Sequence, residues 1–175
     1  MENAFLIIFD IETTRNSLTN KEEIIELACI KINNSFEVLD EFYTLIKPPC
    51  SLSYITKVKT GINDSDLNDK PSLENILASL LNFIKEDMII AHNAKFDYKV
   101  LEENFNRYNL NIKNPFVDSL SLLKTIFPNE KCSLISLKDK FRINKNHHRA
   151  LDDVHSLREI LIHSNRYYSE KFNKN

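Results

Sequence analysis

The sequence lacks the cysteine pattern of a disulfide-bonded or zinc-binding protein. Its three cysteines, Cys29, Cys50 and Cys132, are widely spaced and include no C-x-x-C pair. An odd number of isolated cysteines argues against both a disulfide framework and a zinc site. We therefore interpret all three as free thiols that have no part in function.

Long hydrophobic runs are also absent. The amino terminus carries no basic stretch, and its apolar run, Phe5 to Phe9, is too short for a signal peptide or a membrane span. These features predict a cytoplasmic protein that has no membrane partner.

The chain has no excess of basic residues, since its formal net charge is −2. Proteins that coat long duplex DNA are usually basic, because neutralising phosphates supplies most of their nonspecific affinity. The charge therefore argues against a coating protein. It does not argue against an enzyme that holds a few terminal nucleotides through bound metal ions.

The composition is that of an ordinary globular protein, with 42% apolar and 27% charged residues in a chain of 175. No repeat, low-complexity tract or linker divides it. We predict one domain over residues 1–168, followed by a short polar tail at residues 169–175.

Apolar periodicity predicts strands that are followed by alternating helices and strands. We expect strands at 4–9, 24–32, 36–46, 88–91 and 116–117, and helices at 72–85, 94–108, 120–127, 134–141 and 149–168. The second and third strands are joined by Asn33-Asn34-Ser35, which suits a hairpin, and the first strand is expected to end at Asp10. This order predicts an α/β fold with a mixed sheet, in which an antiparallel meander precedes parallel crossovers.

The first candidate motif is Asp10-Ile11-Glu12-Thr13-Thr14. Residues two apart on a strand share a face, so Asp10 and Glu12 should project together while Ile11 turns into the core. The carboxyl end of a central strand is where α/β sheets commonly place active sites. The motif by itself also fits a strand that ends in polar residues at a turn.

The second motif contains His92, Asn93 and Asp97, in the sequence H-N-A-K-F-D. We expect Asn93 to cap the helix that follows, with Asp97 near its first turn. Acidic residues are also favoured there by the helix dipole alone. Phe96 is expected in the buried stripe of this helix, which would turn Asp97 away from the core and toward a site.

The third motif is the most specific, because His148-Arg149-Ala150-Leu151-Asp152-Asp153 fits H-x-A-x-x-D. Two residues five apart in one helix would lie on different faces. His148 and Asp153 can converge only if His148 lies in the loop before the helix. The pattern selects His148 over His147, and Asp152 is interpreted as an acid at the helix start.

Together these motifs resemble the DEDD exonuclease superfamily in its histidine-bearing DnaQ-like (DEDDh) branch, whose fold is similar to ribonuclease H. The resemblance covers nearly the whole chain and extends to Ile24-Ile25-Glu26-Leu27 and Thr60-Gly61-Ile62. The sister branch has tyrosine four residues before the last aspartate, where this chain has Arg149. The resemblance implies a ribonuclease H-like mixed five-stranded sheet flanked by helices, and 3′→5′ exonuclease activity.

The resemblance also implies roles for individual residues. Asp10, Glu12, Asp97 and Asp153 would hold two divalent ions, Mg²⁺ or Mn²⁺, with Asp10 bridging them. Histidine has an unperturbed pKa of about 6.5, so His148 could accept a proton from the attacking water. The products would be nucleoside 5′-monophosphates. Contacts to the substrate are expected from Thr13, Thr14, Gly61, His92 and Asn93.

One residue departs from the family pattern, and several others could be mistaken for site residues. Arg15 stands where the family usually has glycine, so the turn beside the terminal base should differ. Gly61, the only glycine, marks either a left-handed turn or a close approach to substrate. Asp118 is interpreted as a helix cap rather than a fifth ligand, and His155 and His163 as residues outside the site. A basic set could steer a phosphate backbone and consists of Lys138, Lys140, Arg142, Lys145 and Arg149.

The substrate stays open at the level of sequence. A stand-alone exonuclease acting on the 3′ end of single-stranded or frayed DNA is the first hypothesis, and a proofreading subunit bound to a DNA polymerase is the second. An enzyme that trims RNA or degrades oligoribonucleotides is the third, because spacing cannot show whether a 2′-OH is contacted. A non-catalytic binding module is disfavoured, since all four carboxylates and the histidine are present.

Overall fold

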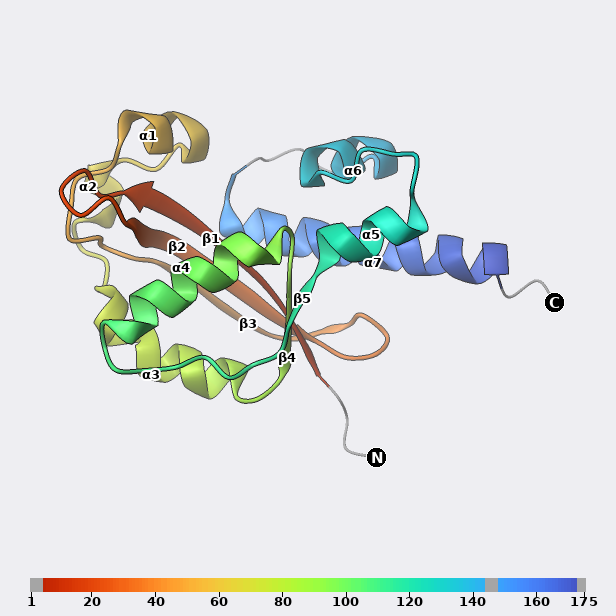
Figure 1. The fold of residues 1–175 in the computed structure, drawn as a ribbon, viewed down its shortest axis with the longest axis horizontal. Helices are drawn as coiled ribbons and strands as arrows, with labels where there is room; N and C mark the ends of the chain where they lie inside the picture. The colour runs from red at the N-terminus through yellow and green to blue at the C-terminus, as the bar shows by residue number, and fades with distance from the viewer. Residues whose placement is uncertain (1–4, 144–147, 173–175) are drawn as a thin grey trace.

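A computed structural model describes residues 5–143 and 148–172 of the chain. His147 and Lys145, considered above, lie outside these residues. The described residues form a five-stranded sheet in the order β3-β2-β1-β4-β5 (Figure 1). The strands are β1 (Leu6–Arg15), β2 (Glu22–Ile32), β3 (Val38–Leu45), β4 (Met88–Ala91) and β5 (Phe116–Asp118).

The sheet is mixed, as predicted. Strands β1, β2 and β3 pair antiparallel, whereas β4 and β5 continue the sheet from β1 in parallel. This is the expected meander followed by crossovers, and it confirms the ribonuclease H-like fold class. Parallel neighbours align their carboxyl ends at one edge of the sheet, so residues that follow β4 and β5 meet there.

Seven helices occur in the described residues. They are α1 (Tyr54–Thr60), α2 (Asp64–Leu67), α3 (Leu73–Ile84), α4 (Ala94–Asn106), α5 (Ser119–Ile126), α6 (Leu134–Phe141) and α7 (Ala150–Phe172). Helices α1 and α2 were not predicted. Helix α7 also continues beyond residue 168, so the first residues of the predicted polar tail are helical.

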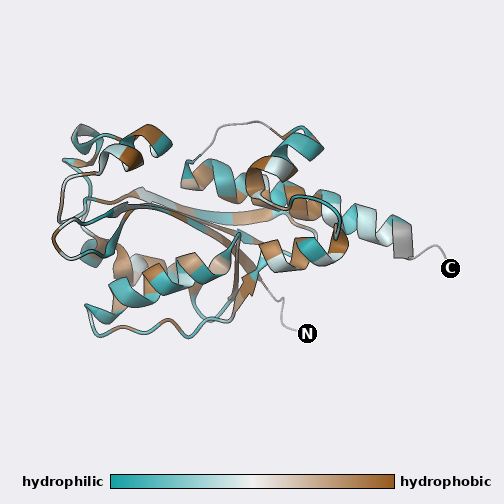
Figure 2. Ribbon diagram, turned by 45° about the horizontal axis from the view of Figure 1, so that its top comes forward, coloured by the Kyte–Doolittle hydropathy of each residue, from teal (hydrophilic) through white to brown (hydrophobic). Residues whose placement is uncertain are grey.

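Side chains alternate between the two faces of β1. Ile7, Phe9 and Ile11 pack with α3 and α4 in one core cluster, whereas Ile8 packs against α7 in another. Figure 2 shows the sheet enclosed between these helical layers. The prediction that Ile11 turns into the core is confirmed, and Asp10 and Glu12 share the parity of Ile8, which places them toward α7.

Strand β1 does not end at Asp10 as expected. Its antiparallel pairing with β2 continues to Arg15↔Glu22, so the backbone stays extended for five more residues. Its parallel pairing with β4 stops earlier, at Ile8↔Ile90. Asp10 and Glu12 therefore lie within a strand but beyond the point where its parallel neighbour has ended.

Helix α1 was missed because its apolar side chains face outward. Tyr54, Ile55 and Val58 are 81%, 76% and 67% exposed, whereas the residues that the helix buries are the polar Thr56 and Thr60. The helix is defined by its ends instead. The Ser53 side chain accepts a hydrogen bond from the N–H of Thr56, and Gly61 closes the helix at φ 72°.

The cysteines and the helices bear on two expectations from composition. All three cysteines are free, and Cys29 and Cys132 are buried. None of the helices in the described part of the chain combines the length and apolar character needed to span a bilayer.

Candidate active site

Residues of all three motifs line one cavity at the edge of the sheet where β4 and β5 end. Its walls include the four predicted carboxylates and the predicted histidine: Asp10, Glu12, Asp97, Asp153 and His148. His92 and Asn93 also line it. The motifs are up to 143 residues apart in sequence, between positions 10 and 153, and the fold brings them together.

Strand β1 provides Asp10 and Glu12. Glu12 is 5% exposed, whereas Asp10 is partly exposed as a residue. The Oδ2 atom of Asp10 is nevertheless buried and has no hydrogen-bond partner. A buried carboxylate oxygen without a donor is unfavourable, so this atom is suited to a ligand that the protein itself does not supply.

Helix α4 provides Asp97, and two details differ from expectation. Asp97 is 4% exposed and belongs to the buried side of the helix, whereas Phe96 is 44% exposed and lines the cavity. The prediction that Phe96 is buried is therefore wrong. The buried side carries polar residues, Asp97 and Asn104, among its apolar ones, so an apolar stripe does not trace it.

Asn93 precedes α4 in a left-handed conformation, with φ 65°, and its side chain makes no capping hydrogen bond. The cap is supplied by Asp118 instead. Its Oδ1 accepts hydrogen bonds from the N–H groups of Asn93 (3.0 Å) and Ala94 (3.2 Å), and from that of Leu120 (3.1 Å) at the start of α5. One carboxylate thus caps two helices. The predicted capping role of Asp118 is confirmed, and that of the Asn93 side chain is wrong.

Helix α7 begins at Ala150, so His148 lies in the loop before it, as the spacing required. His148 has φ 57°, an uncommon conformation for a residue with a side chain. Asp153 stands in the first turn and is 8% exposed. The turn places both side chains at the cavity, although they are five residues apart.

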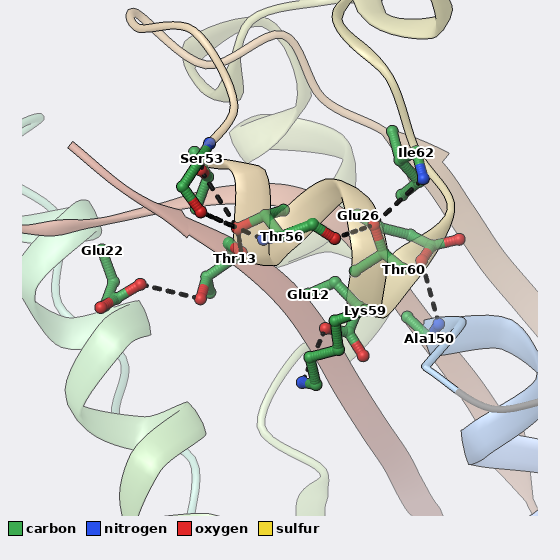
Figure 3. A network of polar contacts seen from close by, with 11 residues as sticks. Glu12, Thr13, Glu22, Glu26, Ser53, Thr56, Lys59, Thr60, Ile62 and Ala150 are labelled. Atoms are coloured by element: carbon green, nitrogen blue, oxygen red, sulfur yellow. Dashed lines mark hydrogen bonds and ion pairs between the residues drawn. The ribbon is translucent and has the colours of Figure 1, made fainter.

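Glu26 on β2 anchors the start of α7. It is fully buried, and its Oε2 accepts a hydrogen bond of 3.1 Å from the N–H of Ala150 (Figure 3). Its Oε1 accepts hydrogen bonds of 2.9 Å from Arg149 Nε and from the Tyr43 hydroxyl. This network holds the residues between His148 and Asp153, and the sequence indicated Glu26 only as part of the family resemblance.

Burial, together with neighbouring charges, perturbs the pKa values of three of the carboxylates. Burial, and then the charges of Asp97, Asp153 and Glu12, raise the pKa of Asp10 well above its usual range. Burial also raises the pKa of Glu12, although Lys59 opposes the shift, and it raises the pKa of Asp97 to about 7. Clustered acids of this kind are typical of a site that binds cations.

Two lysines reach into this cluster. Lys59 on α1 lies 3.2 Å from Glu12 Oε2 (Figure 3), and Lys138 on α6 forms an ion pair with Asp153. Lys138 is 1% exposed, so it is neither a solvated residue nor one that could steer a phosphate backbone from the surface. The contact of Lys138 was missed because the sequence around a lysine does not show whether its side chain is buried. The contact of Lys59 was missed because it lies in a helix that was not predicted.

The donor set fits a hard divalent cation. Ligand atoms of Glu12, His148 and Asp153 lie within 4.8 Å of one another. Asp10 contributes the unpartnered oxygen, and Asp97 lines the same cavity. Mg²⁺ and Mn²⁺ prefer carboxylate oxygens, so these residues suit such an ion without further ligands from the chain.

The predicted substrate-contacting residues separate into two groups. His92 and Asn93 line the cavity, and His92 Nδ1 also lies 3.0 Å from the Ser119 hydroxyl. Thr13, Thr14 and Gly61 do not line it. The Thr14 hydroxyl is buried and accepts a hydrogen bond from the N–H of Ser53, so it secures α1. Gly61 ends α1 with open space around it, which supports the turn interpretation.

The other residues that could be mistaken for site residues lie outside the cavity. His155 lies 2.8 Å from Glu41, and the ring of His163 stacks on Phe141. The Arg15 side chain donates hydrogen bonds to Asn20 and Glu22 rather than to the four carboxylates of the cavity. Of the basic set, Lys140 pairs with Glu130, and Arg142 ends α6 in a left-handed conformation.

Comparison with known proteins agrees with this geometry. Residues 7–161 match the family model described as exonuclease. The DNA polymerase III PolC-type protein of Thermotoga petrophila is 35% identical over 163 residues, which cover 92% of this chain and 12% of that protein. The chain thus spans about one eighth of the length of this relative.

Solved structures share the fold at low sequence identity. The nuclease domain of 3′hExo, a DEDDh family member bound to rAMP, has a TM-score of 0.82 at 16% identity, covering 94% of this chain and 93% of that one. Exonuclease X in complex with 5′ overhanging duplex DNA has a TM-score of 0.74 at 22% identity, covering 97% and 94%.

Proposed function

Because the chain belongs to the exonuclease family, we propose that it is a 3′→5′ exonuclease of the DnaQ-like DEDDh type and that its substrate is the 3′ end of DNA. Single strands and frayed or mismatched ends are the expected forms. Hydrolysis of the terminal phosphodiester bond would release nucleoside 5′-monophosphates.

One observation carries the proposal that the cavity is the site of a metal-dependent nuclease. Four carboxylates and a histidine surround one cavity, and a buried oxygen of Asp10 within it has no hydrogen-bond partner. A structural role does not explain this arrangement, since Lys59 and Lys138 pair with only two of the four acids, and buried acids that face one another destabilise a fold.

The roles of the residues follow from their chemistry. Asp10, Glu12, Asp97 and Asp153 would hold two divalent ions, Mg²⁺ or Mn²⁺, with Asp10 shared between them. When bound, the ions neutralise charge on the phosphate and on the attacking and leaving oxygens. His148 would take a proton from the attacking water, whose oxygen forms a bond to phosphorus as the bond to the 3′ oxygen breaks.

DNA is favoured over RNA by sequence relatives rather than by the site. The PolC-type relative is named a DNA polymerase, and its identity to this chain extends over nearly the whole chain. Of the fold neighbours, one is bound to rAMP and one to DNA, so they do not discriminate. A DNA polymerase is accordingly the partner we propose, supplied either as a separate protein or as further parts of a longer chain.

The proposal is tested by incubating the protein with 5′-labelled single-stranded DNA and matched RNA, in Mg²⁺, Mn²⁺ or chelator. We expect a ladder that shortens from the 3′ end of DNA only when metal is present. Asp10→Ala and His148→Ala should abolish it, whereas His155→Ala, outside the cavity, should not. Faster degradation of RNA would overturn the DNA assignment, and cleavage in chelator would overturn the metal assignment.

A further inference from the structure

The buried lysine Lys138 has no role in the mechanism above. Its side chain is 1% exposed, lines the cavity and forms an ion pair with Asp153 Oδ1. A buried ammonium group is costly unless its charge is paired. Here it is paired with a side chain that would itself bind metal. Its position therefore bears on how the site accepts cations.

Cations are distributed unevenly over the four carboxylates. Glu12 pairs with Lys59 and Asp153 pairs with Lys138. Among the described residues, no lysine or arginine forms an ion pair with Asp10 or Asp97. The two pairs also differ, since the side chain of Lys59 is 50% exposed and can leave for solvent, whereas that of Lys138 is enclosed between α6 and α7.

We propose that Lys138 is a resident cation of the active site, which neutralises Asp153 before metal binds and competes with one of the two divalent ions. This inference rests on the two-ion function proposed above. Asp10 and Asp97 form no ion pair with a lysine among the described residues, so an ion can reach them without breaking one. An ion that needs Asp153 binds only when the ion pair with Lys138 is broken.

If Lys138 competes with metal, it should raise the stability of the metal-free protein and lower the affinity for metal. Without metal, Lys138 stabilises the fold, because Asp153 would otherwise be a buried and unpaired charge. With metal, the same ion pair weakens binding, because the ion must displace the ammonium group from Asp153. Coupling between two binding events in one protein is typically about 5- to 150-fold, and we expect an effect in this range. A lysine that serves only to pack α6 against α7 would stabilise the fold equally in both conditions.

The test is a calorimetric titration of the metal-free full chain with Mn²⁺, comparing the wild type with Lys138→Met. Methionine keeps much of the buried length and removes the charge. We expect two classes of Mn²⁺ site in the wild type, and in K138M a weaker class that is tightened by about tenfold or more. K138M should melt at a lower temperature than the wild type without metal, and this difference should shrink when Mn²⁺ is saturating.

Lys140→Met is the matched control, because Lys140 lies on the same helix and pairs with Glu130 outside the cavity. It should leave the Mn²⁺ isotherm unchanged. Lys138→Arg, which retains the charge, should keep two separate classes of site. If K138M does not fold without metal, Lys138→Gln provides the same comparison with a neutral hydrogen-bond donor.

An isotherm for K138M that coincides with that of the wild type would overturn the inference, as would a loss of stability that persists at saturating Mn²⁺. If the wild type binds Mn²⁺ and shortens DNA in that case, the proposed function stands without it. If the wild type binds no Mn²⁺, the proposed function fails as well.

Discussion

The carboxylate of Asp118 on β5 accepts a hydrogen bond of 3.0 Å from the backbone N–H of Asn93, the residue that leads into α4. Asn93 is in a left-handed conformation and does not cap the helix with its own side chain. The N–H groups of Ala94 and Leu120 bind the same oxygen of Asp118. The position of Asp97, in the first turn of α4, therefore depends on an acid that does not line the cavity.

Asp118→Ala should destabilise the protein by about 1–2 kcal/mol, the usual cost of losing a helix cap. It should also lower exonuclease activity, because α4 carries Asp97 into the site. Asp118→Asn keeps an oxygen acceptor and should retain most of the stability. Urea unfolding and DNA cleavage by the two variants measure these effects, and an Ala variant with unchanged stability would contradict the double cap.

Glu26→Ala should lower exonuclease activity by more than the destabilisation of the fold alone would cause. The substitution removes the acceptor for the N–H of Ala150 and for Arg149, at a cost of about 1–3 kcal/mol. The start of α7 loosens as a result, and His148 and Asp153 lose their alignment. Hydrogen exchange should increase at residues 150–153, and kcat should fall more than KM changes.

Glu41→Ala is the comparison for that experiment, since Glu41 lies on β3 and pairs with His155 away from the cavity. It should affect neither exchange at the start of α7 nor kcat. Equal exchange rates in the Glu26 variant and the wild type would show that Glu26 does not position the helix.

Sequence alone predicts the parts of this fold that burial dictates. The bounds of β4 and α6 were predicted correctly, because β4 is an apolar run and α6 has apolar residues at helical spacing. The shared face of Asp10 and Glu12 was predicted from side-chain alternation, although β1 does not end at Asp10, and the position of His148 before a helix was predicted from the spacing to Asp153. The hydrophobic pattern misses α1, whose apolar residues are exposed, and it misplaces Phe96, whose helix buries Asp97 and Asn104 instead.

Pairings between distant segments are not available from sequence. Lys138 is one of several lysines near the last motif, and only the packing of α6 against α7 determines that it meets Asp153. Glu26 is similar, because its partners Tyr43 and Arg149 lie 17 and 123 residues away. These contacts depend on tertiary structure, and no local spacing encodes them.

The stability of the metal-free protein should fall as the pH rises from about 4 to about 7. Burial raises the pKa of Asp97 to about 7, and the pKa of Asp10 is also raised. The folded protein therefore binds more protons than the unfolded chain in this range, and stability is lost as these acids ionise. Melting temperatures in chelator should be lower at about pH 8 than at about pH 5. Asp97→Asn should flatten this dependence, and saturating Mn²⁺ should remove it.

His148→Gln should separate proton transfer from metal binding. His148 lies close enough to Glu12 and Asp153 to act as a ligand, and it also lines the cavity as a base would. If it accepts the proton of the attacking water, kcat should fall by about 10²- to 10⁴-fold while the affinity for Mn²⁺ changes little, because the carboxylates remain. Mn²⁺ affinity that falls in parallel with kcat would instead identify His148 as a ligand. The same titration on Asp153→Asn, which removes a carboxylate, provides the reference for a lost ligand.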